Sequence, residues 1–368
     1  MDLPALLSVN ESFYPHEGGA EKRAFETLVR LARKGFDVKV LTNPFPDHTN
    51  IPGLEIEYVT DMNESQYFKK GSRKILGVHE FASKLRAKLK EDHEADIFMF
   101  DEFPLLPALK GASVLPVEKL KFFTWHEVLG DFYRRNGLLW KIAERWERKA
   151  ANLFTNNIAV SSAVASMIEN RYNVPGVSVI ENGVNVRELD NQNQKNWGKI
   201  IYIGRIEPHK RVDQLITSIG KVPGVELEVI GAGSQLNHIK HIASSFSNVK
   251  VTGHLPRSQV VEKLKQSWLF AMPSNREGFS IASLEAMAAS VPVITIAGQY
   301  NLAANEVIKD GRNGIIAKSF DDMSARVKML YKDEPAWKDL SKNAHEFSLR
   351  YDWEVITEKL SKILSSSW

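Results

Sequence analysis

The chain is 368 residues long, with 43% hydrophobic and 25% charged residues and a formal net charge of +3. Its length predicts two domains, because a single hydrophobic core usually stops growing beyond about 250–300 residues. The near-neutral charge argues against nucleic acid as a partner. The lack of cysteine excludes disulfides, thiolate nucleophiles and cysteine-based metal sites.

No apolar run approaches the ~20 residues that a membrane-spanning helix needs. Residues 1–4 lead directly into a short apolar run with no basic segment before it, so no secretory signal is expected. We therefore expect a cytoplasmic protein.

Short β-rich apolar runs alternate with segments of helical periodicity, which predicts parallel βαβ units with both sheet faces covered. A helix is expected over residues 19–33, since a basic last turn and Gly35 mark its end. In the first half of the chain, strands are predicted at residues 6–9, 38–41, 56–59, 97–100, 122–125 and 158–160.

The polar run over residues 188–198 predicts an interdomain linker. Strands are then predicted at residues 200–203, 227–230, 249–251, 269–272 and 293–296. The expected fold class is thus α/β, with one Rossmann-like domain over 1–190 and a second over 198–350. Two doubly wound sheets would leave a deep cleft between their carboxyl ends, where such folds bind ligands.

A glycine pair, Gly18 and Gly19, stands where the first strand hands over to a helix. Residues without Cβ let the backbone approach a ligand, and a helix N-terminus offers free N–H groups to phosphate or a sugar hydroxyl. His16 and Glu21 flank the pair and are candidates for contact with an acceptor. The pair alone is a weak pattern, because such turns are common.

A second candidate site opens the second domain, where Gly204 and Arg205 end a strand and Lys210 begins a helix. Two cations at the mouth of an α/β cleft suit a diphosphate, because the Arg guanidinium can bind two oxygens at once and the Lys ammonium acts as a point charge. The alternative is two surface bases near a turn.

The third candidate site is the run from Glu277 to Ala288, directly after a predicted strand. Glu277 and Glu285 straddle a helix start, so their carboxylates can accept hydrogen bonds from vicinal hydroxyls while N–H groups between them face phosphate. A glycosidase acid and base pair is the alternative. However, such a pair usually lies on opposite sides of a cleft.

The spacing Glu-x7-Glu inside E-G-F-x-I-x-x-L-E-A-M-A resembles the retaining glycosyltransferases of family 4, which have the GT-B fold. The resemblance covers nearly the whole chain. Its other motifs lie at residues 18–21, 34–38, 182–185, 204–206 with 210, 231–233, 292–294 and 310–314.

The resemblance implies a role for each matching residue. Arg205 and Lys210 would bind the donor diphosphate and stabilise the leaving group. Glu285 would hold the ribose, Glu277 the transferred sugar, and His126 would face that sugar. The remaining donor-binding positions would be Gly18, Gly19, Gly204, Gly233, Gly278, Phe279, Ser280 and Ile281. The final helix, 351–368, would pack back on the first domain.

Three features qualify this assignment. A lone histidine at a strand end, such as His126, is more often structural than catalytic. The chain has Ser280 and Ser290 where family members commonly carry glycine, and residues 299–301 stand where a glycine-rich loop is common. These departures leave the identity of the sugar open.

The resemblance predicts a retaining hexosyltransferase that uses a UDP or GDP sugar and a hydroxyl acceptor, which could be lipid-linked, a glycan or a small molecule. No metal or cofactor is expected: no Asp-x-Asp ends a strand, and Asp321-Asp322 is interpreted as a helix N-cap. The alternatives are a sugar-nucleotide epimerase or phosphorylase on the same fold, and a non-catalytic two-lobed binding protein.

Eight cations fall between Lys69 and Lys90, interleaved with aromatic and aliphatic residues. The stretch 67–90 is either a solvated helix face beside a loop, or a surface that meets anionic lipid or a charged acceptor. The second possibility would place the protein at the inner face of a membrane.

Overall fold

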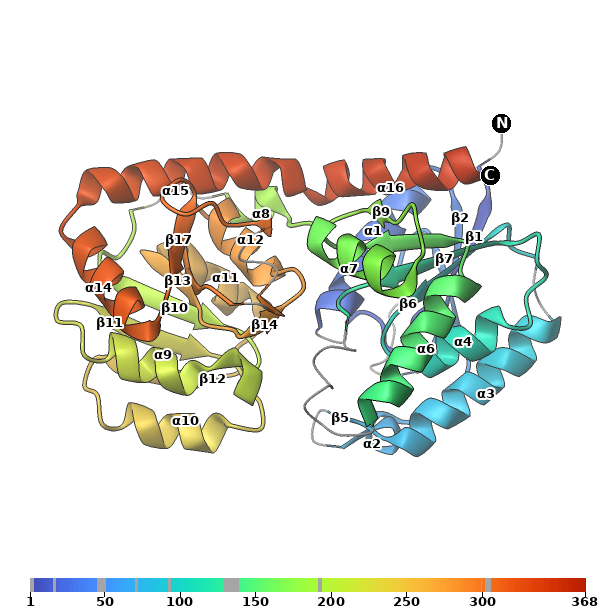
Figure 1. The fold of residues 1–368 in the computed structure, drawn as a ribbon, viewed down its shortest axis with the longest axis horizontal. Coiled ribbons are helices and arrows are strands. Elements are labelled where there is room, and N and C mark those ends of the chain that lie inside the picture. Colours follow the sequence, from blue (N-terminus) through green and yellow to red (C-terminus); the bar gives the residue numbers. More distant parts are fainter. Residues whose placement is uncertain are drawn as a thin grey trace. The chain divides into compact units, whose positions relative to one another are not determined.

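The computed structural model describes residues 3–15, 18–44, 51–69, 72–91, 94–128, 139–190, 194–298, 300–301 and 306–368. The chain forms two Rossmann-like α/β units, each with its own parallel sheet (Figure 1). The first comprises Met1–Glu181 and Trp353–Trp368, and the second comprises Asn182–Asp352. No helix in the described part of the chain is long and apolar enough to cross a bilayer.

The first unit has a seven-stranded parallel sheet in the order β3-β2-β1-β6-β7-β8-β9. Its strands are β1 (Ala5–Val9), β2 (Asp37–Thr42), β3 (Leu54–Tyr58), β6 (Ile97–Asp101), β7 (Leu120–Trp125), β8 (Asn156–Ala159) and β9 (Ser178–Val179). The six strands predicted in this half are confirmed, because long apolar runs covered on both faces are easy to recognise. The short strand β9 was not predicted.

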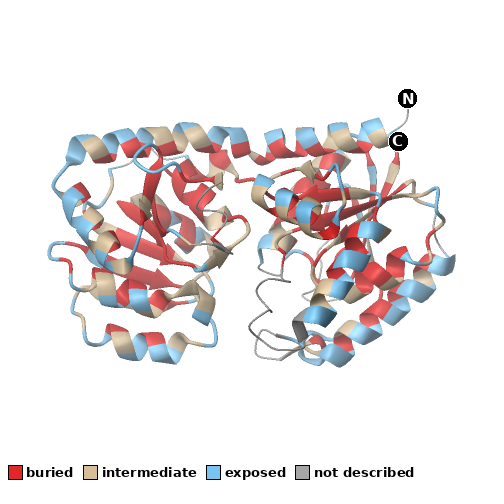
Figure 2. Cartoon of the chain, in the orientation of Figure 1, coloured by how far each residue is buried: buried red, intermediate tan, exposed pale blue. Residues whose placement is uncertain are grey.

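Helices α1 (Gly19–Arg33), α3 (Ile75–Glu91), α4 (Leu105–Ala112), α6 (Leu139–Leu153) and α7 (Ser162–Tyr172) accompany this sheet. Short elements α2 (Glu64–Tyr67), β4 (Phe68–Lys69) and β5 (Ser72–Arg73) precede α3. Figure 2 shows the central strands almost wholly buried and the helices buried mainly along one side, as expected for amphipathic helices around a sheet.

The second unit has a six-stranded parallel sheet in the order β12-β11-β10-β13-β15-β17. Its strands are β10 (Lys199–Ile203), β11 (Glu226–Ile230), β12 (Val249–Gly253), β13 (Leu269–Met272), β15 (Val293–Ile296) and β17 (Gly314–Ala317). The five predicted strands are confirmed. The sixth strand, β17, was missed because its four residues follow a turn and are not part of a longer apolar run.

The helices of the second unit follow the same alternation. They are α8 (Val186–Leu189), α9 (Val212–Ile219), α10 (Leu236–Ala243), α11 (Arg257–Gln266), α12 (Ile281–Ala288), α14 (Phe320–Tyr331) and α15 (Glu334–Ser348), with 3-10 turns at Pro208–Lys210 and Leu349–Tyr351. A two-stranded sheet joins β14 (Arg276–Glu277) to β16 (Tyr300–Asn301).

Residues 182–190 group with the second unit, although the sequence assigns them to the first domain. The Val184 N–H donates to the Tyr351 carbonyl at 2.8 Å, which joins this segment to the end of the unit. The helix α16 (Trp353–Ser367) groups with the first unit. It contacts α1 through the ion pairs Arg30–Glu354, at 2.8 Å, and Lys34–Glu358, at 2.6 Å.

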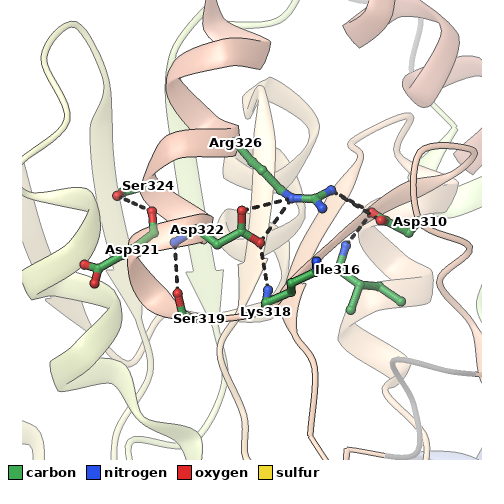
Figure 3. A network of polar contacts seen from close by, with 8 residues as sticks. All are labelled: Asp310, Ile316, Lys318, Ser319, Asp321, Asp322, Ser324 and Arg326. Atoms are coloured by element: carbon green, nitrogen blue, oxygen red, sulfur yellow. Dashed lines mark hydrogen bonds and ion pairs between the residues drawn. The ribbon is translucent and has the colours of Figure 1, made fainter.

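The assignment of Asp321-Asp322 as a helix N-cap is wrong by two residues. The cap of α14 is Ser319, whose Oγ accepts the Asp322 N–H at 3.1 Å (Figure 3). Asp322 accepts the Lys318 N–H at 2.8 Å and faces Arg326 at 3.2 Å. Arg326 also reaches Asp310 at 3.1 Å, so this acidic cluster holds β17 and α14 together.

Candidate functional site

In each sheet the strand order reverses once, between β1 and β6 in the first unit and between β10 and β13 in the second. Open α/β sheets bind ligands beyond the carboxyl ends of the strands at such a point. Gly204 and Arg205 follow β10, and Glu277 lies shortly after β13. The sequence-predicted donor residues therefore lie where this topology favours a ligand.

The structure brings Lys210 and Glu277 together as an ion pair. Lys210 ends the short 3-10 turn Pro208–Lys210. The Asn275 N–H donates to the His209 carbonyl at 2.9 Å, and the Ser274 hydroxyl donates to Glu277 Oε1 at 2.8 Å. The two loops are thus linked by two contacts, the ion pair and the backbone hydrogen bond, and the ammonium and carboxylate are both half-buried.

Arg205 is exposed, and its carbonyl accepts the Tyr202 hydroxyl at 2.8 Å. This bond fixes the backbone at the end of β10 and leaves the guanidinium toward solvent. A fixed backbone with an exposed guanidinium is suited to binding an anionic ligand.

Two further basic groups at this edge were not assigned from the sequence. Burial, and after it the charges of Lys210 and Arg276, lower the pKa of His209 to about 4. His209 is therefore neutral at pH 7, and Arg276 is close enough to affect it. Nothing in the sequence around Arg276 distinguishes it from any other loop cation.

Gly231 and Gly233 allow the loops after β10 and β11 to pack closely. A Cβ on Gly231 would lie 1.9 Å from the Gly204 carbonyl oxygen, and one on Gly233 would lie 2.4 Å from the Ile206 carbonyl oxygen. These positions require glycine for backbone packing alone. The role of Gly204 and Gly233 in binding a donor stays a prediction.

Glu285 lies in α12, is only 6% exposed, and forms an ion pair with Arg257 at 2.9 Å. Arg257 also contacts Glu188 with two nitrogens, each at 3.2 Å. Burial would lower the pKa of Arg257, but the two carboxylates outweigh it and raise the pKa. Sequence reasoning missed Arg257, because the three residues come from different helices far apart in the chain.

The residues before α12 explain one departure from the family pattern. Ser280 is the N-cap, and its Oγ accepts the Ser283 N–H at 3.2 Å. Phe279 is 8% exposed and packs against Tyr351, with ring centroids 5.8 Å apart. Gly278 precedes them and Ile281 starts the helix, whose N-terminus carries a partial positive charge.

Ser290, at the other departure, has a φ of 57°. This left-handed conformation favours glycine, the residue that the family pattern predicts there.

In the first unit, His126 follows β7 and is held by the two acidic residues at the end of β6. His126 Nε2 lies 3.0 Å from Asp101 Oδ1. The N–H groups of His126 and Glu127 donate to Glu102 Oε2 at 2.7 and 2.9 Å. Complete burial raises the pKa of Glu102 well above its usual value, with like charges on Glu147 and Glu127 adding to the effect.

The glycine pair begins α1, with Gly18 as the N-cap and Gly19 as the first residue. A Cβ on Gly18 would lie 2.0 Å from Glu21 Oε2, so the glycine makes room for this carboxylate. Glu21 is 9% exposed and lines a hollow together with Ser12 and Asp101, between the ends of β1 and β6. His16 lies outside the described residues.

The basic stretch 67–90 carries several ion pairs. Arg73 contacts the buried Glu11 at 2.5 Å, Lys84 contacts Asp61 at 2.8 Å, and Lys88 pairs with Glu57. The side chains of Lys69 and Lys70 lie outside the described part. Contact between this stretch and a membrane stays a prediction.

These features define a two-unit α/β enzyme fold with a basic and acidic site at the strand ends. Two family models match it: "Glycosyltransferase Family 4" matches residues 17–188 and "Glycosyl transferases group 1" matches residues 187–347. The chain belongs to the group 1 glycosyltransferases, which have the GT-B fold.

Individual curated proteins resemble only part of the chain. An uncharacterized glycosyltransferase of Methanocaldococcus jannaschii is 30% identical over 190 residues, which are 50% of this chain and 52% of that protein. The chain thus spans about half the length of this curated relative.

The fold extends over whole solved structures. A sucrose-phosphate synthase from Thermosynechococcus elongatus matches with a TM-score of 0.84 at 14% identity, covering 99% of this chain and 98% of that one. Anabaena HepE, in complex with UDP and glucose, matches with a TM-score of 0.74 at 17% identity, covering 99% and 100%. At these identities the likeness establishes the fold alone.

Proposed function

We propose that the chain transfers a hexose from a nucleotide diphosphate sugar to a hydroxyl acceptor, with retention of anomeric configuration and without a metal. The observation that carries the proposal is the Lys210–Glu277 ion pair at the point where the strand order reverses. In this proposal the ammonium would contact phosphate and the carboxylate beside it would accept hydrogen bonds from sugar hydroxyls. Anabaena HepE, a solved structure of the same fold, is in complex with UDP and glucose.

The leaving group would be stabilised by cations. Arg205 and Lys210 would contact the diphosphate, and the negative charge that develops as the sugar–phosphate bond breaks would strengthen both contacts. Because Lys210 is paired with Glu277 before the donor binds, the phosphate would share the ammonium and leave carboxylate oxygens free for the transferred sugar.

The nucleoside would be held by Glu285, whose carboxylate would accept hydrogen bonds from the ribose hydroxyls. Arg257 pairs with this buried carboxylate and orients it. The positive end of the α12 dipole, beginning at Ser280 and Ile281, would favour the phosphates.

Retention needs no protein nucleophile in this proposal. As the bond to phosphate breaks, an oxocarbenium-like centre forms, and the acceptor hydroxyl attacks from the face that the phosphate leaves. The hydroxyl proton passes to the departing phosphate oxygen. His126, fixed by Asp101 and Glu102, would face the sugar and position it.

A donor panel tests the proposal. UDP and GDP sugars are added one at a time while the melting temperature is followed, because a ligand that binds only the folded state stabilises it. One donor should raise the melting temperature of the wild type. In Lys210→Ala this rise should shrink, since a charge-assisted hydrogen bond worth about 1.5–3 kcal/mol is lost.

Lys240→Ala is the matched control, because Lys240 is an exposed lysine of the same unit in the last turn of α10. Equal donor responses in Lys210→Ala and the wild type would contradict the proposed site. Product analysis with a labelled donor separates transfer from epimerisation, phosphorolysis and simple binding. The cytoplasmic location remains a prediction.

A further inference from the structure

Helix α6 has one packed face and one face that no other described element covers. The packed side buries Glu147 and Ala150 completely. Beside this packed side, Ile142 and Trp146, one turn apart, are 53% and 41% exposed. Figure 2 shows exposed residues along this helix. Large apolar side chains at (i, i+4) on an uncovered face form a continuous patch rather than isolated exposures.

The charges around this patch are of one sign. Lys141, Arg145 and Lys149 are exposed beside Ile142 and Trp146. Within the described part of the chain, Arg145 and Lys149 form no side-chain hydrogen bond or ion pair. Two free cations therefore stand next to the apolar patch.

The carboxylates of α6 are directed to partners inside the unit. Glu144 is half-buried and lies 3.7 Å from Arg148 and 3.6 Å from Arg171. Glu147 accepts the Tyr172 hydroxyl at 2.7 Å. Neither carboxylate neutralises the exposed cations. The uncovered face of α6 thus combines an aromatic ring, an aliphatic side chain and uncompensated positive charge.

The position of the patch relates it to the candidate site. Helix α6 lies in the crossover between the parallel neighbours β7 and β8. A crossover helix runs opposite to its strands, so its first half lies near their carboxyl ends. Ile142 and Trp146 are in that half, and His126 follows the carboxyl end of β7. The patch is therefore toward the edge of the first unit that carries His126.

We propose that the uncovered face of α6 docks on an anionic lipid bilayer. Tryptophan is well suited to the boundary between headgroups and acyl chains, and an aliphatic neighbour adds buried apolar area. Lysine and arginine beside them are attracted to acidic headgroups. In the stretch 67–90 three of the cations, Arg73, Lys84 and Lys88, are in ion pairs. This proposal does not depend on the identity of the donor.

Vesicle co-sedimentation tests the proposal, using phosphatidylcholine vesicles with and without phosphatidylglycerol. The wild type should sediment only with the anionic vesicles, and less so at high salt. Ile142→Gln/Trp146→Gln and Arg145→Gln/Lys149→Gln should each weaken binding. Two lysine or arginine contacts of about 1 kcal/mol each correspond to a loss of about thirtyfold.

Two control variants locate the surface. Met329→Gln, on α14 between Lys328 and Lys332, changes a methionine that is 71% exposed in the other unit and should leave binding unchanged. Ile75→Gln/Leu76→Gln removes two side chains at the start of α3, each 84% exposed, and should also leave binding unchanged. Unchanged melting temperature and donor response in every variant show that the fold is intact.

Three results would overturn the proposal. The wild type could fail to sediment with anionic vesicles. Binding could be lost in Ile75→Gln/Leu76→Gln and kept in the α6 variants, which would assign it to the stretch 67–90. The α6 variants could change the oligomeric state on gel filtration, which would make the patch a contact between copies. None of these results affects the proposed transferase activity, because donor response is measured separately.

Discussion

Glu102 offers a sharp test of how the first unit holds its candidate catalytic histidine. Its side chain is 0% exposed and accepts the N–H groups of His126 and Glu127 at 2.7 and 2.9 Å. Glu102→Ala leaves both amides without this acceptor. A buried polar group left unpaired costs about 1–3 kcal/mol, so the variant should lose about 2–6 kcal/mol of unfolding free energy.

Glu102→Gln separates hydrogen bonding from charge, because the amide oxygen can still accept both N–H groups. The pKa of Glu102 is raised in the folded state, by burial first and by Glu147 and Glu127 next. A carboxyl with a raised folded pKa stabilises the protein fully below its unfolded pKa, about 4.5, and this contribution is lost as the pH rises. The wild type should therefore lose stability relative to Glu102→Gln as the pH rises above about 4.5.

Urea unfolding followed by circular dichroism at several pH values measures both effects. Leu109→Ala, a buried apolar truncation in the same unit, is a control for general loss of packing and should show no such pH dependence. A Glu102→Ala variant as stable as the wild type would refute the role of this side chain. A difference between wild type and Glu102→Gln that does not change with pH would refute the raised pKa.

Three other predictions concern the second unit. Gly231→Ala should destabilise the protein by more than ~3 kcal/mol, because its Cβ would lie 1.9 Å from the Gly204 carbonyl oxygen. The control Gly253→Ala, with nothing within 4 Å of the added Cβ, should cost only about 1–2 kcal/mol for its backbone conformation. Equal melting temperatures of the two variants would contradict this reasoning. The wild type should lose stability as the pH falls from about 6.5 to 4, because the pKa of His209 is lowered to about 4 in the folded state and the unfolded state takes up the proton first. In His209→Gln this loss should be smaller by about 1–2 kcal/mol in thermal melts, a magnitude that allows for the partial exposure of the side chain. Parallel pH profiles of the two proteins would count against it. Arg257→Met should raise the KM for the donor and lower the free energy of unfolding by about 1–3 kcal/mol, because Glu285 loses its ion pair with Arg257. The control Arg326→Met, in the ion-pair cluster at the start of α14, should lower the free energy of unfolding without changing that KM.

The arrangement of strands could be predicted from the sequence because parallel strands buried on both faces are continuous apolar runs. The same logic placed Arg205, Lys210 and Glu277 at strand ends, where a parallel sheet collects them at one edge. The ion pair between Lys210 and Glu277 follows from that topology. Local pattern was therefore sufficient to place these side chains near the ends of strands.

Contacts between elements could not be predicted in this way. Arg257 reaches Glu285 and Glu188 only because α8, α11 and α12 pack together, and no spacing in the sequence reports that packing. The support of His126 by Asp101 and Glu102 likewise depends on the neighbouring register of β6 and β7. The cap of α14 was misplaced because Ser319 and Asp322 are both good capping residues, and only the backbone decides between them.

The configuration of the product tests the central claim most directly. The enzyme is incubated with the α-linked nucleotide sugar that stabilises it and with an acceptor that accelerates nucleotide release, and the anomeric proton of the new glycoside is observed by NMR. We predict an α-glycoside in the wild type and almost none with Lys210→Ala. A β-glycoside would contradict retention, and a product yield unaffected by Lys210→Ala would contradict the site itself.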